Sequence, residues 1–265
     1  MRLPRLAHLL GRLTLVGVAI LAVAASPADA QRRRGGWGGR GVCNTPGGHE
    51  IAPNLPYDGR FVFARIRYAE GPGSGWCYDY PYTELNFATI LREITSANPY
   101  MEGGNVYTFD DPELLKFPVA YVSEPGYWYP SASEAQGLRD YLAKGGFVIF
   151  DDFAFAQEWM VFEYGLRTAL PNAKIVPMDP SHPIFDSFFR IGSLAMTYPG
   201  RPSIQAEFYG VYEDNDPKKR LVAIINFNND IGDYLEHSGQ GRFPINLTND
   251  AYKFAVNYIM YGMTR

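Results

Sequence analysis

The sequence lacks the short motifs of several common enzyme classes. It has only 2 cysteines and 4 histidines among 265 residues, and none of them forms a CxxC pair or an adjacent Cys–His pair of the zinc-site type. No phosphate loop, no GxGxxG fingerprint between a strand and a helix, and no GxSxG nucleophile elbow occurs. We therefore expect no metal site with a fixed ligand spacing, no nucleotide cofactor and no serine-type catalytic triad.

Long hydrophobic runs are also scarce, and the longest one stands at the start of the chain. Three arginines open the sequence, an apolar stretch covers residues 13–25, and Ala28-Asp29-Ala30 offers a small-residue cleavage site. This order is typical of a secretory signal peptide over residues 1–30. Because the apolar stretch is too short for a comfortable membrane span, we expect a periplasmic or secreted protein without a transmembrane helix. An uncleaved N-terminal anchor is the alternative.

Once the predicted signal peptide is removed, the chain has fewer basic than acidic residues. Removing its three arginines and Asp29 from the 24 basic and 28 acidic residues leaves a net charge of about −6, which argues against nucleic acid as a partner. Residues 31–57 are rich in glycine and arginine and predict a flexible leader. This leader is either a solvated spacer or a contact for acidic polymers and lipid head groups. Residues 58–265 hold the apolar side chains of one domain.

The two cysteines, Cys43 and Cys77, both remain after removal of the signal. In an oxidising compartment an isolated pair of cysteines is most simply a disulfide. The sequence therefore predicts a bond that ties the leader to the loop after the first strand of the domain.

Strand-like and helix-like segments alternate from residue 60 onward. Runs rich in alternating, aromatic or β-branched residues predict strands, at residues 60–68, 106–109, 119–122, 147–150, 174–176, 204–212 and 221–226. Helices are predicted from a Thr83 cap, from a capping box of Ser131 with Glu134, over residues 157–170, and at the end of the chain. This alternation is typical of a three-layer α/β domain with a mostly parallel sheet.

Polar side chains follow several of the predicted strands. In a parallel sheet the loops at the carboxyl ends of the strands form the ligand crevice. The candidate ligand-binding residues in these loops are Asp79, Tyr80, Glu124, Tyr127, Trp128, Asn229 and Asp230. Asp151 and Asp152 end the fourth predicted strand and are the candidate catalytic acid or base, with His182 as an orienting group.

Several carboxylates in one crevice repel each other unless a cation, a proton or a basic group joins them. Three interpretations stay open. Oxygen ligands could hold a divalent cation; carboxylates and aromatic rings could bind a sugar, with hydrolase-like acid and base chemistry; or Asp151 and Asp152 cap the next helix while the tyrosines pack in the core. His182 in the same way is either a structural residue or a catalytic one.

The same segments resemble a bacterial family of unknown function, the domain of unknown function numbered 4159, over residues 60–263. The resemblance rests on Phe63-Ala64-Arg65-Ile66-Arg67-Tyr68, Tyr78-Asp79-Tyr80-Pro81 with Asn86, Asp110-Asp111-Pro112-Glu113-Leu114, Leu138-Arg139-Asp140-Tyr141-Leu142 with Gly145-Gly146-Phe147, Asp151-Asp152, His182-Pro183-Ile184-Phe185 and Asn229-Asp230.

That family is similar to class I glutamine amidotransferases and to the ThuA-like sugar-utilisation proteins. The resemblance implies a flavodoxin-like sheet. It does not imply amidotransferase chemistry, because the strand end that would carry the cysteine nucleophile carries Asp151-Asp152. Where many members have a Gly-His-Gly-like turn after the third strand, this chain has Glu124-Pro125-Gly126, so no histidine role is carried over there.

We expect an exported α/β domain that binds a polar, carbohydrate-like small molecule at the carboxyl edge of its sheet. No cofactor is required, although a divalent cation fits the acidic residues. Whether the protein is an enzyme stays open. The alternative function is a non-catalytic module that binds a protein partner of the cell envelope.

Overall fold

The computed structural model describes residues 50–69 and 75–264. The predicted signal peptide, most of the predicted leader and Cys43 lie outside these residues, so the export signal and the disulfide to the buried Cys77 stay predictions. Within the described ranges no helix has the length and apolar character needed to cross a membrane.

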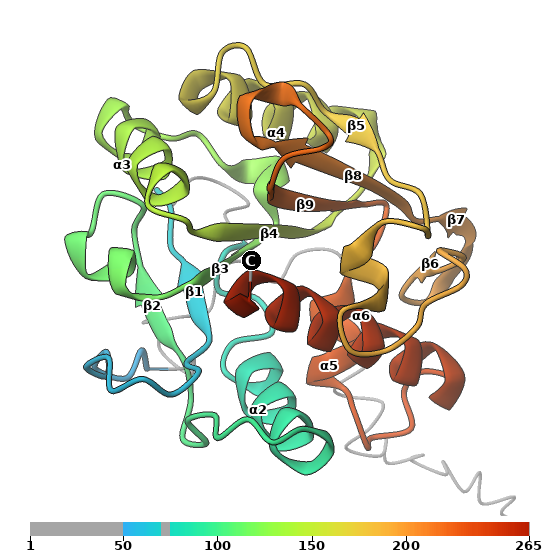
Figure 1. Ribbon diagram of the computed structural model, residues 1–265. Helices are drawn as coiled ribbons and strands as arrows, with labels where there is room; N and C mark the ends of the chain where they lie inside the picture. Colours follow the sequence, from blue (N-terminus) through green and yellow to red (C-terminus); the bar gives the residue numbers. More distant parts are fainter. Residues whose placement is uncertain (1–49, 70–74, 265) are drawn as a thin grey trace, which may run out of the picture. The chain divides into compact units, whose positions relative to one another are not determined.

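Helices and strands alternate along the chain as predicted, and a seven-stranded sheet forms the centre of the fold (Figure 1). The elements are β1 (Ala64–Ile66), α2 (Tyr82–Ile94), β2 (Asn105–Tyr107), η1 (Pro112–Lys116), β3 (Val119–Ser123), η2 (Pro125–Tyr127), α3 (Ala132–Ala143), β4 (Phe147–Phe153), α4 (Phe155–Ala169), β5 (Val176–Pro177), η3 (Pro183–Asp186), β6 (Thr197–Tyr198), β7 (Arg201–Gln205), β8 (Glu207–Tyr212), η4 (Glu213–Asn215), β9 (Leu221–Phe227), α5 (Ile231–Glu236) and α6 (Ile245–Thr264).

The sheet is mostly parallel, which confirms the expected fold class. Its strands lie in the order β2-β1-β3-β4-β9-β8-β5. The first five of these strands pair in parallel, whereas β8 and β5 add an antiparallel edge. The single strand predicted over residues 204–212 is divided between β7, which pairs with β6 in a separate two-stranded sheet, and β8. The carboxyl ends of five parallel strands therefore meet along one edge.

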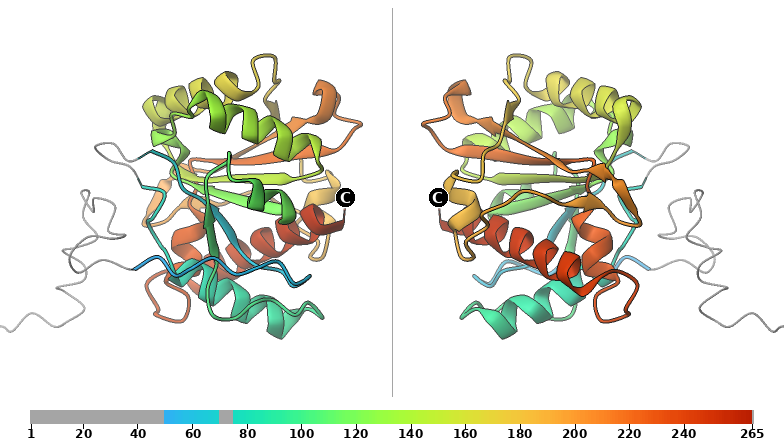
Figure 2. Two further views of the ribbon diagram at one scale, coloured as in Figure 1. Left: turned by 90° about the vertical axis from the view of Figure 1, so that its left-hand side faces the viewer. Right: turned by 90° about the vertical axis from the view of Figure 1, so that its right-hand side faces the viewer.

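Helices cover both faces of the sheet. α3 and α4 lie on one face, and α2, α5 and α6 lie on the other (Figures 1 and 2). Alternate residues of β4 divide between the two cores: Val148 and Phe150 pack toward α3 and α4, and Phe147 and Ile149 pack toward α6. Both faces of the central strands are buried, which explains why their sequences are nearly continuous hydrophobic runs.

The local signals in the sequence differ in how well they place helix starts. Ser131 and Glu134 form the reciprocal capping box that was predicted at the start of α3. The Thr83 cap was wrong: α2 begins at Tyr82, and Thr83 is buried inside it with its hydroxyl donating to the carbonyl of Gly232 at 3.0 Å. A buried threonine can satisfy its hydroxyl through a distant backbone group, and a cap predicted from sequence does not consider that partner.

Part of the predicted flexible leader is held against β2. The side chain of Asn54 donates to the carbonyl of Val106 at 2.8 Å and accepts from the Val106 backbone N–H at 2.8 Å. Asn105 makes a similar pair of hydrogen bonds with the backbone of Leu55. Residues 54 and 55 thus satisfy the outer edge of the sheet, where β2 has no further strand partner.

Candidate functional site

A β-bulge at the end of β4 separates the roles of two consecutive aspartates. Phe150 pairs with Ile225 and Phe153 pairs with Phe227, so three steps along β4 match two steps along β9. Asp152 has a φ of 63°, in the left-handed region that non-glycine residues seldom adopt. Because such a bulge breaks the alternation of side chains, the two neighbouring carboxylates enter different surroundings.

Asp151 is fully buried and holds elements of the fold together. Its Oδ2 accepts hydrogen bonds from the Tyr121 hydroxyl at 2.8 Å and the Gly232 N–H at 3.0 Å. Its Oδ1 accepts from the Asn226 side-chain amide at 2.9 Å, and the oxygen of that amide accepts from Tyr258 at 2.9 Å. Burial raises the pKa of Asp151, while these hydrogen bonds oppose the rise. Asp151 therefore joins β3, β4 and β9 to the first turn of α5.

Three other aspartates form a group that we call the acid cluster: Asp79, Asp152 and Asp230. One carboxylate oxygen from each lies within 4.8 Å of the others. They come from the loop after β1, the end of β4 and the residue before α5, which follows β9. Asp230 also caps α5, because its Oδ1 accepts from the backbone N–H of Asp233 at 2.7 Å. The carboxyl edge thus gathers acids that are up to 151 residues apart in the chain, from Asp79 to Asp230.

A buried ion pair fixes the loop that carries Asp79. Arg65 and Glu84 are both fully buried and lie 2.5 Å apart. The Arg65 Nη1 donates to the carbonyls of Trp76 and Tyr78 at 3.1 and 3.0 Å. A guanidinium can hold several acceptors in one fixed geometry. Asp79 follows directly with a φ of 63°, so its position is set by the backbone as well as by its neighbours.

Glu124 adds a fourth carboxylate next to the acid cluster. Its backbone has a φ of 47°, and its carbonyl accepts from the Tyr68 hydroxyl at 2.7 Å. A Cβ placed on Gly75 would lie 1.9 Å from Glu124 Oε2, so a larger residue at position 75 would displace the Glu124 carboxylate. Glu124 interacts electrostatically with Asp152 and Asp79. Three of these four acids therefore occupy left-handed backbone, a strained arrangement that is common where side chains are held for function.

Burial and mutual repulsion favour the protonated forms of these acids. Burial, followed by repulsion from Asp151, raises the pKa of Asp152 to about 7. Burial also raises the pKa values of Asp79, Glu124 and Asp230 well above their ordinary range, and repulsion by Asp152 is the next cause for all three. At neutral pH the site can therefore hold a proton, a hydroxyl-bearing ligand or a cation between its oxygens.

The acid cluster has the donor set of a hard divalent cation, because Asp79, Asp152 and Asp230 supply carboxylate oxygens. A second group on α5 suits a metal less well. His237 Nε2 lies 3.2 Å from Asp233 and 3.0 Å from Glu236. Although burial opposes it, the contacts with both acids raise the pKa of His237 to about 9. The Arg242 guanidinium also lies against His237 Nε2, so this nitrogen already contacts three charged side chains.

A family model described as Domain of unknown function (DUF4159) matches residues 62–263. The chain belongs to this family. None of the curated proteins matches the sequence. The resemblance predicted over residues 60–263 is therefore confirmed at the level of the family.

Two aromatic residues predicted to face a ligand are core residues of the DUF4159 domain. Trp128 is fully buried, with its ring 5.8 Å from that of Phe109 and 5.5 Å from that of Phe150. Tyr80 is also buried, and its hydroxyl accepts from the Ala52 N–H at 3.4 Å. In this structure neither ring is exposed as a stacking surface. The sequence places aromatic residues in a loop but does not show which way the rings turn.

The other predicted residues are spread over different surroundings. Tyr127 is 36% exposed and interacts electrostatically with Glu124. Asn229 is fully buried, and its amide lies 3.9 Å from the sulfur of Met196. His182 caps η3 through its Nδ1 and packs against the rings of Tyr212 and Tyr261.

His182 is placed at the opposite end of the central strands from the acid cluster. Tyr261, against which it packs, lies 5.5 Å from the ring of Phe147, the first residue of β4. Asp152 is near the last residue of the same strand, and each strand residue adds about 3.3 Å. The structure therefore does not bring His182 together with the aspartates.

Three side chains at the site were not singled out from the sequence. Ser123 and Tyr198 donate to Asp152 through their hydroxyls, at 3.3 and 3.4 Å. Glu158 accepts from the Ala154 N–H at 2.7 Å and adds negative charge near Glu124 and Asp152. Ser123 could have been found, since it ends β3 beside Asp151 in register. Tyr198 comes from a two-residue strand for which the sequence gives no signal.

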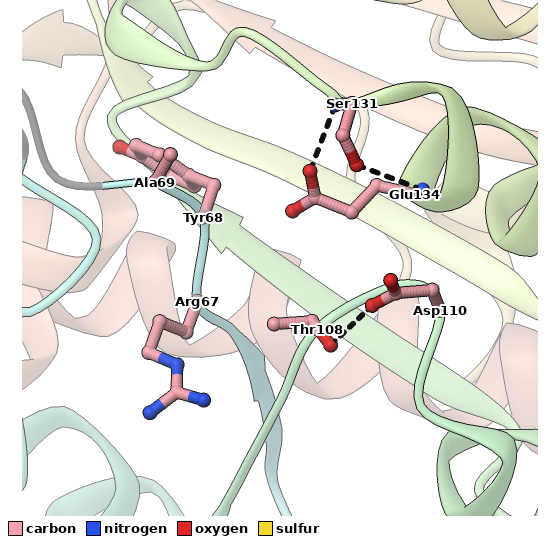
Figure 3. Close-up of a pocket in the computed structure, with 7 residues that line it drawn as sticks. All are labelled: Arg67, Tyr68, Ala69, Thr108, Asp110, Ser131 and Glu134. Atoms are coloured by element: carbon pink, nitrogen blue, oxygen red, sulfur yellow. Dashed lines mark hydrogen bonds between the residues drawn. The ribbon is translucent and has the colours of Figure 1, made fainter.

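A separate cavity of about 430 Å³ lies at the carboxyl ends of β1 and β2. Figure 3 shows two hydrogen-bonded pairs in its lining: Ser131 and Glu134, each side chain accepting from the other's backbone N–H, and Thr108 with Asp110. The first pair caps α3 and the second closes the turn after β2. These groups have local structural partners, so the acid cluster is the stronger candidate site.

Proposed function

We propose that this DUF4159 domain is exported and binds a polar, hydroxyl-rich small molecule of the carbohydrate type at the acid cluster. The observation that carries the proposal is the convergence of three aspartates whose oxygens lie within 4.8 Å of each other. Asp79 Oδ2 has no hydrogen-bond partner within the described part of the chain. Closely spaced carboxylates with free acceptor capacity suit vicinal hydroxyl groups, which can donate to two oxygens at once.

The same site can perform acid and base chemistry. Asp152 has a pKa of about 7, which is near the optimum for a group that must both give and take a proton at neutral pH. Asp79 and Asp230 would orient the ligand, and Asp151 would hold the edge rigid. In a catalytic version of the proposal, Asp152 is the general acid or base of a hydrolase-like reaction.

We also propose that the sheet has a flavodoxin-like topology. The parallel strands lie in the order β2-β1-β3-β4-β9, and the flavodoxin-like order 2-1-3-4-5 has the same form. This order supports a flavodoxin-like, class I glutamine amidotransferase-like sheet without the cysteine nucleophile. In such sheets ligands bind at the carboxyl edge, where the acid cluster lies.

A thermal-shift screen tests the function. At ten times its Kd, a bound ligand should stabilise the domain by about 1.4 kcal/mol, which is roughly 3–6 °C in Tm for a domain of this size. The screen covers monosaccharides and disaccharides, each with and without a divalent cation. Asp152→Asn should abolish the shift while the protein stays folded.

The matched control is Asp186→Asn, which removes one carboxylate from an exposed position. It should keep the full ligand-induced shift. A screen in which neither sugars nor cations alter Tm contradicts the proposal, as does an unchanged shift in Asp152→Asn.

Exposed aromatic residues favour the alternative, an envelope module that binds a protein partner. Tyr129, Met160 and Tyr164 are 57%, 63% and 63% exposed, and the two tyrosine rings lie 6.1 Å apart. Exposed apolar groups that gather in this way mark many interaction surfaces. Cross-linking in envelope extracts should capture one defined partner, and Tyr164→Ser with Met160→Ser should abolish that capture if this reading is right.

A further inference from the structure

An open groove of about 740 Å³ lies where the start of α4 meets β7, β8 and β9. Three aromatic side chains form its floor. The ring of Trp159 lies 5.1 Å from that of Tyr209 and 4.8 Å from that of Phe227. All three residues are partly exposed. In Figure 1, α4 lies over the β8 and β9 side of the sheet, so this floor joins the helix to the sheet.

Phe155 extends the aromatic surface at a cost in backbone energy. It has a φ of 67° and is 45% exposed. Left-handed backbone is strained for a residue that carries a Cβ. Its N–H donates to Asn228 Oδ1 at 3.1 Å, and Asn228 is itself left-handed, with a φ of 53°. The fold thus holds an apolar ring at the surface in a conformation that glycine would adopt without strain.

Polar groups with fixed orientation stand beside this aromatic surface. Glu207 accepts from the Tyr209 hydroxyl at 2.5 Å and from the Asn228 amide at 3.2 Å. A carboxylate has lone pairs beyond those two hydrogen bonds. Flat aromatic faces flanked by planar polar side chains match a sugar ring, which has apolar C–H faces and hydroxyl groups around its edge.

Side-chain contacts connect one end of the groove to the acid cluster. The guanidinium of Arg201 lies 5.6 Å from the ring of Phe155 and 5.8 Å from the ring of Tyr198. The Tyr198 hydroxyl in turn donates to Asp152 at 3.4 Å. One line of contacts therefore leads from the acid cluster to the first aromatic ring of the groove.

We propose that the groove binds successive rings of an oligosaccharide, of which one unit occupies the acid cluster. The ligand class is a β-linked, gluco-configured chain, because its rings present flat C–H faces to aromatic side chains and its equatorial hydroxyls point to the groove edge. This inference rests on the proposed function, since it extends the ligand of that same site.

Isothermal titration calorimetry with cellohexaose and with glucose tests the inference. Cellohexaose should bind at least about tenfold more tightly than glucose, since it covers the groove as well as the cluster. Phe155→Gly should remove most of that difference and leave glucose binding unchanged. Its Tm should stay close to that of the wild type, because relief of the strained positive φ offsets the greater chain entropy of glycine.

Met160→Ala is the matched control, because Met160 is exposed on the same helix but does not line the groove. It should bind cellohexaose like the wild type. The proposal that the groove binds sugar rings is wrong if the two sugars bind with equal affinity, or if Phe155→Gly binds cellohexaose as tightly as the wild type does. Either result leaves the function proposed for the acid cluster intact. Cellohexaose binding that survives Asp152→Asn overturns the link between groove and cluster. If no sugar binds and Phe155→Gly changes only self-association in sedimentation velocity, the groove is a protein contact and the inference is wrong.

Discussion

Asp151→Asn is expected to lower the stability of the domain by about 3 kcal/mol, or roughly 6–12 °C in Tm. The substitution keeps the size of the side chain but replaces one acceptor oxygen with a donor. If the new oxygen faces Tyr121 and Gly232, the new amide faces the amide of Asn226. Asn226 cannot turn to relieve this contact without losing its hydrogen bond from Tyr258. At least one buried donor is left without an acceptor, and thermal unfolding measures the loss.

The neighbouring substitution Asp152→Asn is the control, because it changes the same atoms one residue along. At pH 7.5 it should raise Tm, since it removes a charge that Asp79, Glu124 and Asp230 repel. Equal effects of the two substitutions would show that the bulge does not separate their roles. Such a result would remove the distinction between a structural aspartate and a functional one.

The sequence was sufficient to predict that acids from separate loops gather at one edge of the sheet. That prediction needed only the alternation of strands and helices and the rule that carboxyl ends of parallel strands lie together. It brought Asp79, Asp152 and Asp230 to one place although they come from three different connections. Short connections limit the number of topologies, so errors of a few residues at strand ends did not alter the result.

The sequence was not sufficient to separate Asp151 from Asp152. A regular strand would place them on opposite faces, but the bulge between β4 and β9 depends on the register of a strand that lies about 75 residues further along. The same limit applies to Trp128 and Tyr80. Their burial depends on α4 and on residue 52, which pack on them from elsewhere in the chain. The surroundings of these four residues depend on segments that are distant in the sequence, and a local sequence pattern contains no information about those segments.

The fold therefore combines a charged cluster and an aromatic groove at the loop between β4 and α4. β4 ends in Asp152 and Phe153, and Phe155 follows two residues later. A bulge and two left-handed residues, Asp152 and Phe155, let this short segment turn a carboxylate toward one site and a ring toward the other. Backbone strain at both positions is consistent with a segment shaped for ligand contact rather than for stability alone.

The ligand-free domain is expected to be more stable at pH 5 than at pH 7. Asp152 has a folded-state pKa of about 7, raised from 3.8, so the folded protein binds more protons than the unfolded chain between these values. Stability must then fall as pH rises through that window and level off above it. For Asp152 alone, two pH units correspond to about 2 kcal/mol, or roughly 4–8 °C in Tm, and the raised pKa values of Asp79, Glu124 and Asp230 act in the same direction. His237, with a pKa of about 9, adds a further loss only above its unfolded value near 6.5.

Asp152→Asn should reduce the change between pH 5 and pH 7, since one of the titrating groups is gone, whereas Asp186→Asn should leave it intact. Calcium or magnesium should stabilise the wild type more at pH 7.5 than at pH 5, because a cation competes with protons for the same oxygens. If Tm instead rises from pH 5 to pH 7 in the absence of ligand, the aspartates are not held close together in a buried site. Both the acid cluster and the binding function proposed for it would then be wrong.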